Sequence, residues 1–193
     1  MSDKSDALVG PVDVTMRRPT LFGVPAMPIL TAPLVARRAQ VEEAEALAVL
    51  LGRAFEAESW DAAGTERELF CDETVRATLV VGAEGRLVAT ASLQVRPDVP
   101  ECGWVRWVAT DLDRRREGLA RALVIAVLAM VRQAGCREAR LRTTTDRLAA
   151  IPLYLQLGFE PLVTGDPERE VWERVIRLLS GEAGGGRVAP PAG

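Results

Sequence analysis

Between residues 113 and 120 the sequence reads Asp113-Arg114-Arg115-Arg116-Glu117-Gly118-Leu119-Ala120. The preceding residues, 103–110, are rich in β-branched and aromatic side chains and predict a strand. In the following residues, 118–133, apolar side chains recur three and four positions apart, which predicts a largely buried helix. A helix start presents unpaired backbone N–H groups and a partial positive charge, so it favours a bound anion. Gly118 and Ala120 would let a phosphate approach, and Arg115, together with Arg114 or Arg116, would screen its charge. On these residues alone, an arginine-rich surface loop remains an open interpretation.

The spacing Arg115-x-x-Gly118-x-Ala120 matches the Gln/Arg-x-x-Gly-x-Gly/Ala signature of the GNAT (GCN5-related N-acetyltransferase) superfamily, in the same strand-loop-helix setting. A second match lies downstream, because residues 149–160 resemble the A-x-x-x-Y-x-x-x-G-F block of that family. The two matches occur in the family's order and at a suitable separation. The chain therefore resembles GNAT enzymes, and within them the bacterial type that acts on small molecules.

This resemblance implies acetyl-CoA as the cosubstrate. The sequence shows no cluster of metal ligands, so we expect no metal. In the family the loop cradles the pyrophosphate of coenzyme A, and the backbone at the end of the preceding strand pairs with the pantetheine arm. Arg147 stands where the commoner family member has a coenzyme-contacting asparagine. The cofactor-binding residues implied are therefore Val108, Ala109, Thr110, Arg115, Arg116, Glu117, Gly118, Leu119, Ala120 and Arg147.

The order of predicted elements indicates an α/β fold, a GNAT-like mixed central sheet flanked by helices on both faces. Two helices are expected at 41–55 and 65–71, then a hairpin within 77–95 joined by the four residues 82–85. Strands at 103–110 and 138–143 flank the long helix, and a short helix ends before Gly158. A final antiparallel pair is expected at 159–163 and 170–176. We divide the chain into an N-terminal arm (1–35), a GNAT acetyltransferase domain (36–178) and a flexible C-terminal tail (179–193).

Composition removes several kinds of chemistry. The 193 residues contain no histidine, which excludes histidine bases and Ser-His-Asp or Cys-His systems. Lys4 is the only lysine, so Schiff-base and P-loop chemistry are disfavoured. Three cysteines without a C-x-x-C spacing indicate buried, reduced thiols and neither a disulfide framework nor a metal site. The scattered arginines and the net charge of −3 do not indicate nucleic-acid binding.

The N-terminus lacks a secretion-signal pattern and no run is long and apolar enough to span a bilayer, so we expect a cytoplasmic protein without membrane partners. A homodimer is left open. The expected partner is a small-molecule amine acceptor. Residues 56–74 are rich in acidic side chains, which would attract a cationic amine, although an ordinary solvated surface has the same composition.

Tyr154, the only tyrosine, falls on the position of the family's general acid, and Glu101 is the carboxylate to test first as general base. A packed tyrosine and a solvated strand-edge carboxylate are the alternative interpretations of these two residues. Trp60, Trp104 and Trp107 could line an acceptor cleft, but core or rim positions are common for such residues. Two other functions stay open: a coenzyme A-binding sensor or interaction module without catalysis, and a redeployed fold that uses acyl-CoA for other chemistry.

Overall fold

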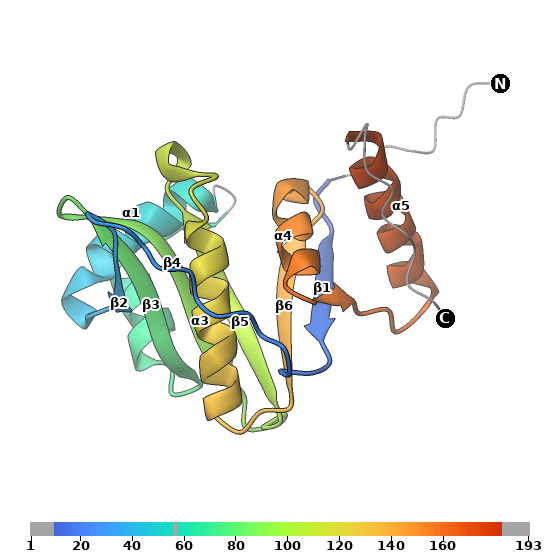
Figure 1. Ribbon diagram of the computed structural model, residues 1–193, viewed down its shortest axis with the longest axis horizontal. Coiled ribbons are helices and arrows are strands. Elements are labelled where there is room, and N and C mark those ends of the chain that lie inside the picture. Colours follow the sequence, from blue (N-terminus) through green and yellow to red (C-terminus); the bar gives the residue numbers. More distant parts are fainter. Residues whose placement is uncertain (1–9, 56–57, 183–193) are drawn as a thin grey trace. The chain divides into compact units, whose positions relative to one another are not determined.

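The computed structural model describes residues 10–55 and 58–182, and its strands form a mixed seven-stranded sheet in the order β2-β3-β4-β5-β6-β1-β7 (Figure 1). The strands are β1 (Asp13–Arg18), β2 (Val35–Arg38), β3 (Val75–Ala83), β4 (Arg86–Val95), β5 (Cys102–Thr110), β6 (Glu138–Thr144) and β7 (Glu160–Pro161). The α-helices are α1 (Ala44–Ala54), α2 (Ala62–Glu66), α3 (Leu119–Gln133), α4 (Ile151–Gln156) and α5 (Asp166–Glu182). Shorter helical turns are η1 (Val41–Glu43), η2 (Arg67–Cys71), η3 (Leu112–Arg114) and η4 (Leu148–Ala150).

The chain divides into two compact units. Arg18–Leu141 form the larger unit, which holds the helices α1 to α3 and the strands β2 to β5. The described residues within Met1–Arg17 and Arg142–Gly193 form the smaller unit, which holds α4, α5, β7 and most of β1. Strand β6 begins in the larger unit and ends in the smaller one.

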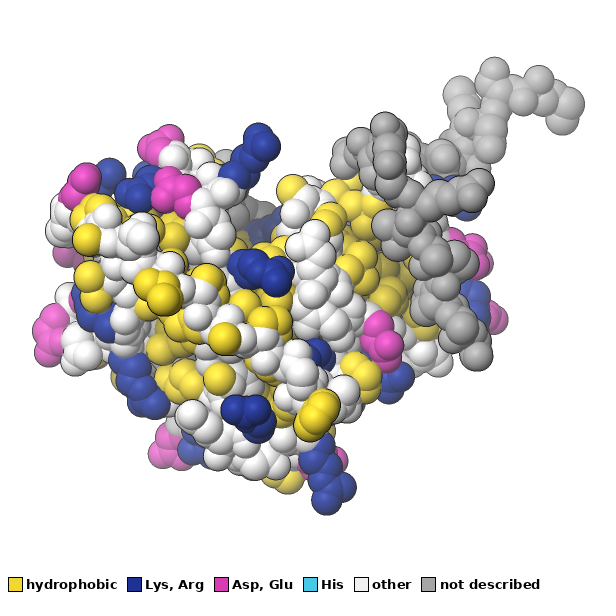
Figure 2. Space-filling view, viewed as in Figure 1, with side chains coloured by type: hydrophobic (Ala, Val, Ile, Leu, Met, Phe, Trp, Pro, Cys, Tyr) yellow, Lys and Arg dark blue, Asp and Glu magenta, His cyan; other side chains and the backbone are white. Residues whose placement is uncertain are grey.

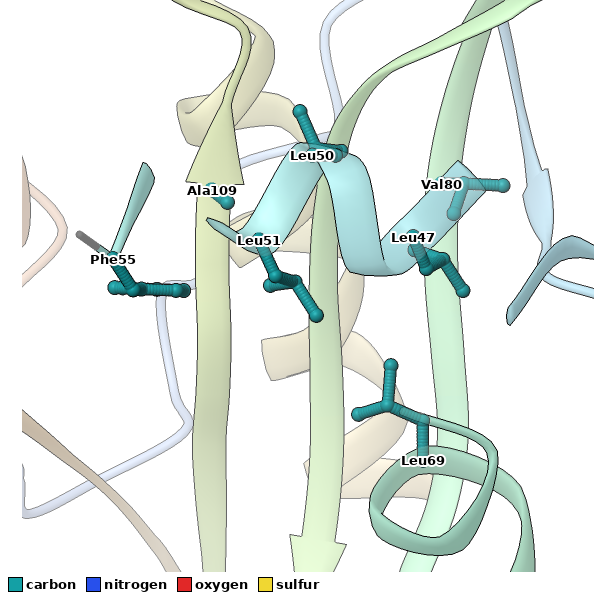
Figure 3. Packing of buried hydrophobic residues seen from close by; sticks show 7 residues of the cluster. All are labelled: Leu47, Leu50, Leu51, Phe55, Leu69, Val80 and Ala109. Carbon is teal, nitrogen blue, oxygen red and sulfur yellow. The ribbon is translucent and has the colours of Figure 1, made fainter. Parts of the chain in front are cut away.

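Within the larger unit both faces of the sheet are covered by helices. Six consecutive residues of β4, Val88 to Leu93, are all buried, and neighbouring strand residues point to opposite faces. On one face α1 packs through Leu47, Leu51 and Phe55 in a cluster that includes Val80 of β3 and Ala109 of β5 (Figure 3). Helix α3 covers the other face, as Figure 1 shows. The predicted fold class is confirmed.

The hairpin β3–β4 is tighter than predicted. Strand β3 extends to Ala83 and β4 starts at Arg86, so the connection is two residues rather than the four residues 82–85. Glu84 (φ 52°) and Gly85 (φ 77°) both have positive φ, the geometry that two-residue turns need to match the twist of the strands. Gly82 is therefore a strand residue.

Strand β5 contains a bulge that the sequence did not indicate. Ser92 of β4 pairs with Arg106 and Thr90 pairs with Ala109, so β5 has one residue more than β4 between these pairs. Trp107 lies at the bulge, and its φ of 49° is a left-handed conformation that is costly for a residue with a large side chain. Before the bulge odd-numbered residues such as Gly103 face α3, and after it Ala109 faces α1.

The smaller unit corrects the prediction for the C-terminal region. Residues 170–176 are part of helix α5, not a strand, because their apolar residues recur at helical spacing and bury Trp172 and Val175, three positions apart. Strand β7 is only Glu160–Pro161, and it pairs antiparallel with β1, not with 170–176. Helix α5 also includes residues 179–182 of the expected tail, and residues 183–193 lie outside the described part of the chain. Of the thiols expected to be buried, Cys71 is exposed.

The contact between β5 and α3 gives a stability prediction. A Cβ on Gly103 would lie 2.5 Å from Cγ1 of the fully buried Val131, so Gly103→Ala forces a shift in a packed core. We expect a loss of about 1–3 kcal/mol in the free energy of unfolding, measured by urea denaturation.

Gly52 of α1 provides the matched control, because a Cβ there meets nothing within 4 Å. Gly52→Ala should be neutral or stabilising by about 0.5–1 kcal/mol, as in other helix interiors. The double variant Gly103→Ala/Val131→Ala should be less destabilised than the sum of its single variants. Additive effects would show that Val131 is not what resists the new methyl group.

Candidate active site

The arginine-rich loop begins at Asp111, directly after β5. The Asp111 backbone N–H donates to the Val88 carbonyl (2.8 Å), which extends the pairing with β4 by one residue. One carboxylate oxygen of Asp111 accepts from the Asp113 N–H at 3.0 Å, and its backbone carbonyl accepts from the Arg114 N–H at 3.0 Å. This local capping explains why η3 forms where it does. Asp111 was not among the predicted site residues, although an aspartate at the start of a turn is a recognisable sequence signal.

The three arginines of the loop differ in their partners. Arg114 donates to both carboxylate oxygens of Glu117, at 2.7 and 2.9 Å. This pairing raises the pKa of Arg114 and lowers the pKa of Glu117, so both groups stay charged and neutralise each other. Arg115 and Arg116 are exposed, and neither forms an ion pair with a described residue. The positive charge that the loop offers to a ligand is therefore that of Arg115 and Arg116.

The loop leads into α3 through a left-handed residue. Gly118, the N-cap of α3, has φ 78°, and Arg116 has φ 69°. A Cβ on Gly118 would meet nothing within 4 Å, so the space beside the helix start is open. Leu119 is almost fully buried in the core, so only its backbone can face a ligand, whereas Ala120 is partly exposed. The residues predicted to bind a phosphate are thus gathered at the start of a 15-residue helix.

At the end of β5 next to the loop, the described strand pairs are those with β4. Parallel pairing of β5 with β6 covers Cys102 to Val105 and stops there, while β5 goes on pairing with β4 as far as Thr110. Val108, Ala109 and Thr110 thus carry backbone groups that are not paired with β6 in the described ladder. The buried Thr110 Oγ1 also has no hydrogen-bond partner among the described residues.

Tyr154 and Arg147 lie in the smaller unit. Arg147 precedes η4, and Tyr154 lies on α4, where its ring makes an edge-to-face contact with Phe159 (centroids 6.1 Å apart). Burial raises the pKa of Tyr154 to about 12, and the positive charge of Arg147 opposes this rise. The phenol is therefore protonated at neutral pH and able to donate a hydrogen bond.

Glu101 is not brought together with the loop. It is exposed and precedes β5, whereas the loop follows the other end of that strand. Its backbone carbonyl accepts from the Arg137 N–H at 2.7 Å, which joins β5 to the start of β6. The neighbouring Cys102 is buried, and this burial raises the pKa of its thiol to about 12, so it does not form a thiolate at neutral pH.

Of the acidic residues in 56–74, Glu66 lies on α2 and Glu68 on η2, whereas Glu58 and Asp61 precede α2, Asp72 and Glu73 follow η2, and Glu56 is outside the described residues. Arg67, Glu68, Cys71 and Asp72 line a surface hollow of about 240 Å³. Hydrogen bonds from Thr74 lower the pKa of Asp72, so its carboxylate stays ionised. Trp60 and Trp107 are partly buried against the core cluster under α1, and Arg106 stacks on Trp107 at 4.7 Å from the ring centroid.

The surface charges, the helix lengths and the placement of metal-ligating side chains bear on whether the chain binds nucleic acid, a membrane or a metal ion. Figure 2 shows arginines and acidic side chains spread over the face in view, and the described residues there do not gather into one continuous basic area. None of the helices within 10–55 and 58–182 is long and apolar enough to cross a bilayer. These same residues contain no cluster of three or more side chains suited to hold a metal ion.

The acetyltransferase (GNAT) family model matches residues 44–159, and the chain belongs to this family. Human N-acetyltransferase 8 is 41% identical over 68 residues, which are 35% of this chain and 29% of that protein. Mycothiol acetyltransferase of Saccharomonospora viridis is 36% identical over 92 residues, 45% of this chain and 30% of that protein. The chain therefore spans less than a third of the length of these two relatives.

Solved structures show the same fold. A GCN5-related N-acetyltransferase from Sphaerobacter thermophilus superposes with a TM-score of 0.63 at 22% identity, covering 78% of this chain and 48% of the other. The ribosomal-protein-S18-alanine N-acetyltransferase of Escherichia coli gives 0.58 at 23% identity, covering 67% and 79%. At these identities the likeness establishes the fold of the chain.

Because Tyr154 is the only tyrosine, the absorbance of tyrosinate reports on it alone. In the native protein we expect titration near pH 12, and in the unfolded protein near the ordinary value of about 10. A pKa raised on folding stabilises the fold fully below pH about 10, and this contribution is lost as pH rises through the folded pKa.

Unfolding measured between pH 10 and 12 should therefore show a loss of stability that is smaller in Tyr154→Phe. Native titration near pH 10 would mean that the phenol is open to solvent.

Proposed function

We propose that the chain transfers an acetyl group from acetyl-CoA to an amine. The observation that carries this proposal is the loop before α3, where Arg115 and Arg116 stand exposed beside an open helix start. The two phosphates of coenzyme A need positive charge and backbone N–H donors that they can approach closely. This loop, with the helix start that follows it, supplies both. Family membership supports the use of the cosubstrate.

The pantetheine arm would lie along the end of β5. Its amide groups can pair with the backbone of Val108, Ala109 and Thr110 as an added strand, because the described pairs between β5 and β6 end at Val105. The Thr110 hydroxyl, for which the described residues offer no hydrogen-bond partner, is proposed as a further hydrogen-bonding group beside the arm. Arg147 is proposed as a coenzyme contact on the strength of the family resemblance alone.

In the reaction the amine nitrogen attacks the thioester carbonyl, a C–N bond forms and the C–S bond breaks. The amine loses a proton to a base or to water, and coenzyme A leaves as the thiolate. Tyr154 is proposed to donate its O–H toward the leaving sulfur. Glu101 stays a proposed base, but its position before β5, with an exposed carboxylate, favours the solvated-edge interpretation.

The acceptor is proposed as a small amine, drawn by the acidic side chains in and around α2 and η2, within residues 58–73. The names of the relatives do not decide its size: one names mycothiol, and another names an alanine of a ribosomal protein. A screen of amines with acetyl-CoA, followed by mass spectrometry of the acceptor, would identify it. Binding of acetyl-CoA without any acetylated product would favour a sensor, and a different product would favour redeployed chemistry.

The proposed coenzyme site is tested by Gly118→Glu. The new side chain would enter the open space at the helix start and place a carboxylate where the diphosphate should bind. Residue 118 also has positive φ, so some backbone strain is expected. Calorimetry should show at least about tenfold weaker binding of acetyl-CoA, the size of one lost charged hydrogen bond or more.

Gly118→Ala, which adds the same strain without the charge, is the matched control. It should weaken binding much less than Gly118→Glu. Equal affinity of folded Gly118→Glu and the parent protein would overturn the site assignment.

The proposed role of Tyr154 is tested by Tyr154→Phe, which keeps the ring contact with Phe159 and removes only the hydroxyl. Removing one donor aimed at charge that develops in the transition state costs about 10²–10³-fold, so we expect kcat to fall at least tenfold while acetyl-CoA affinity stays unchanged. A normal kcat, with chemistry shown to limit the rate, would make Tyr154 a packing residue.

A further inference from the structure

An ion pair ties the first helix to the loop before α3. Arg53, in the last turn of α1, donates from Nη1 to Oδ2 of Asp111 at 2.9 Å, across 58 residues of sequence. Its Nη2 lies 3.8 Å from Oδ2 of Asp113. The Asp111 side chain is 10% exposed and that of Arg53 is 42% exposed, so the pair lies at the edge of the core.

Asp111 is the residue through which this pair can act on the loop. Its two carboxylate oxygens have different tasks: Oδ2 receives Arg53, and Oδ1 caps the Asp113 N–H. The backbone of Asp111 is also fixed at both ends, to Val88 and to Arg114. After this anchor, residues 115–118 are exposed, and Arg116 adopts a left-handed conformation that is costly for a non-glycine residue and has to be held in place.

Helix α1 is a rigid base for the contact, because Leu47, Leu50 and Leu51 are buried in the core cluster (Figure 3). The pair is partly solvated, so its contribution to global stability should be small. Its local effect is larger, since losing Arg53 leaves the Asp111 carboxylate largely buried without its cationic partner.

We propose that Arg53 is a positioning residue for the coenzyme loop: through Asp111 it holds residues 112–118 in the conformation that receives the diphosphate. This inference rests on the proposed function, because it takes coenzyme A as the ligand of the loop. Arg53 itself touches neither the reacting atoms nor, in this proposal, the coenzyme.

The test compares Arg53→Ala and Asp111→Asn with the parent protein. Asp111→Asn retains an oxygen that can cap the Asp113 N–H and removes the charge that Arg53 pairs with. Arg37→Ala is the matched control, because Arg37 is an arginine of similar exposure that forms its own ion pair, with Glu43 at 2.6 and 2.7 Å, and this pair does not involve the loop. Circular dichroism and the midpoint of thermal unfolding establish that each variant is folded.

The first readout is affinity for acetyl-CoA and for acetyl-pantetheine, which lacks the diphosphate. In both test variants we expect the Kd for acetyl-CoA to rise about tenfold, as for the loss of one charged hydrogen bond, with the Kd for acetyl-pantetheine unchanged. Arg37→Ala should change neither constant. Equally weakened binding of both ligands would mean that Arg53 supports the unit as a whole and not the loop in particular, which would overturn the proposal. Unchanged binding of acetyl-CoA would also overturn it.

The second readout needs no ligand. The loop contains the three consecutive arginines Arg114, Arg115 and Arg116, so limited trypsin digestion with mass spectrometry measures how ordered it is. Cleavage after these arginines should be faster in Arg53→Ala than in the parent protein and in Arg37→Ala. A parent protein that does not bind acetyl-CoA would refute the proposed function, and with it the coenzyme role of Arg53. Unchanged cleavage in Arg53→Ala, with parent binding intact, would refute the positioning role alone.

Discussion

Strand β5 carries one residue more than β4 between the pairs Ser92–Arg106 and Thr90–Ala109, and the candidate site depends on that extra residue. Side chains alternate between the faces of a sheet, so one added residue reverses the face of every residue that follows. Ala109 therefore joins the core under α1, and Asp111, two residues on, lies on the same side and reaches Arg53 of α1. Without the bulge, Asp111 would point toward the face covered by α3, and the loop would lose its anchor.

The positive charges of the loop are all carried by arginine, in a chain that has only one lysine. Arginine presents a planar fork, which suits the two-bond pairing of Arg114 with Glu117 and the two aspartate contacts of Arg53. Since Arg114 and Glu117 neutralise each other, their pair shapes the loop rather than attracting a ligand. Arg116 holds a left-handed conformation that costs a non-glycine residue roughly 1–2 kcal/mol. Contacts with a bound diphosphate could offset part of that cost, whereas Gly118 adopts a similar φ without it.

Local patterns in the sequence predicted most of the larger unit. The spacing of Leu47 and Leu51 predicted α1, and the apolar run after Gly118 predicted α3, because both helices bury one continuous face. The bulge at Trp107 could not be predicted, since it depends on which residues of β4 and β5 pair. The Arg53–Asp111 contact could not be predicted either, because it joins residues far apart in the sequence. In 170–176 the error was one of period: Trp172 and Val175 fit a helix better than a strand.

The burial of Tyr154 limits the kind of acid it can be in the proposed reaction. With a pKa of about 12 it is a weaker acid than an ordinary thiol, whose pKa is about 8.5. Complete proton transfer from this phenol to a leaving thiolate would therefore be uphill by roughly 3.5 pKa units, or about 5 kcal/mol. A hydrogen bond from the phenol to the sulfur has no such penalty, and it strengthens as negative charge develops there in the transition state. Tyr154 would then stabilise the departing thiolate while staying protonated, and the thiol would take its final proton from solvent. Since such a donor functions in its neutral form, the same burial that makes Tyr154 a poor acid keeps it available across the physiological pH range.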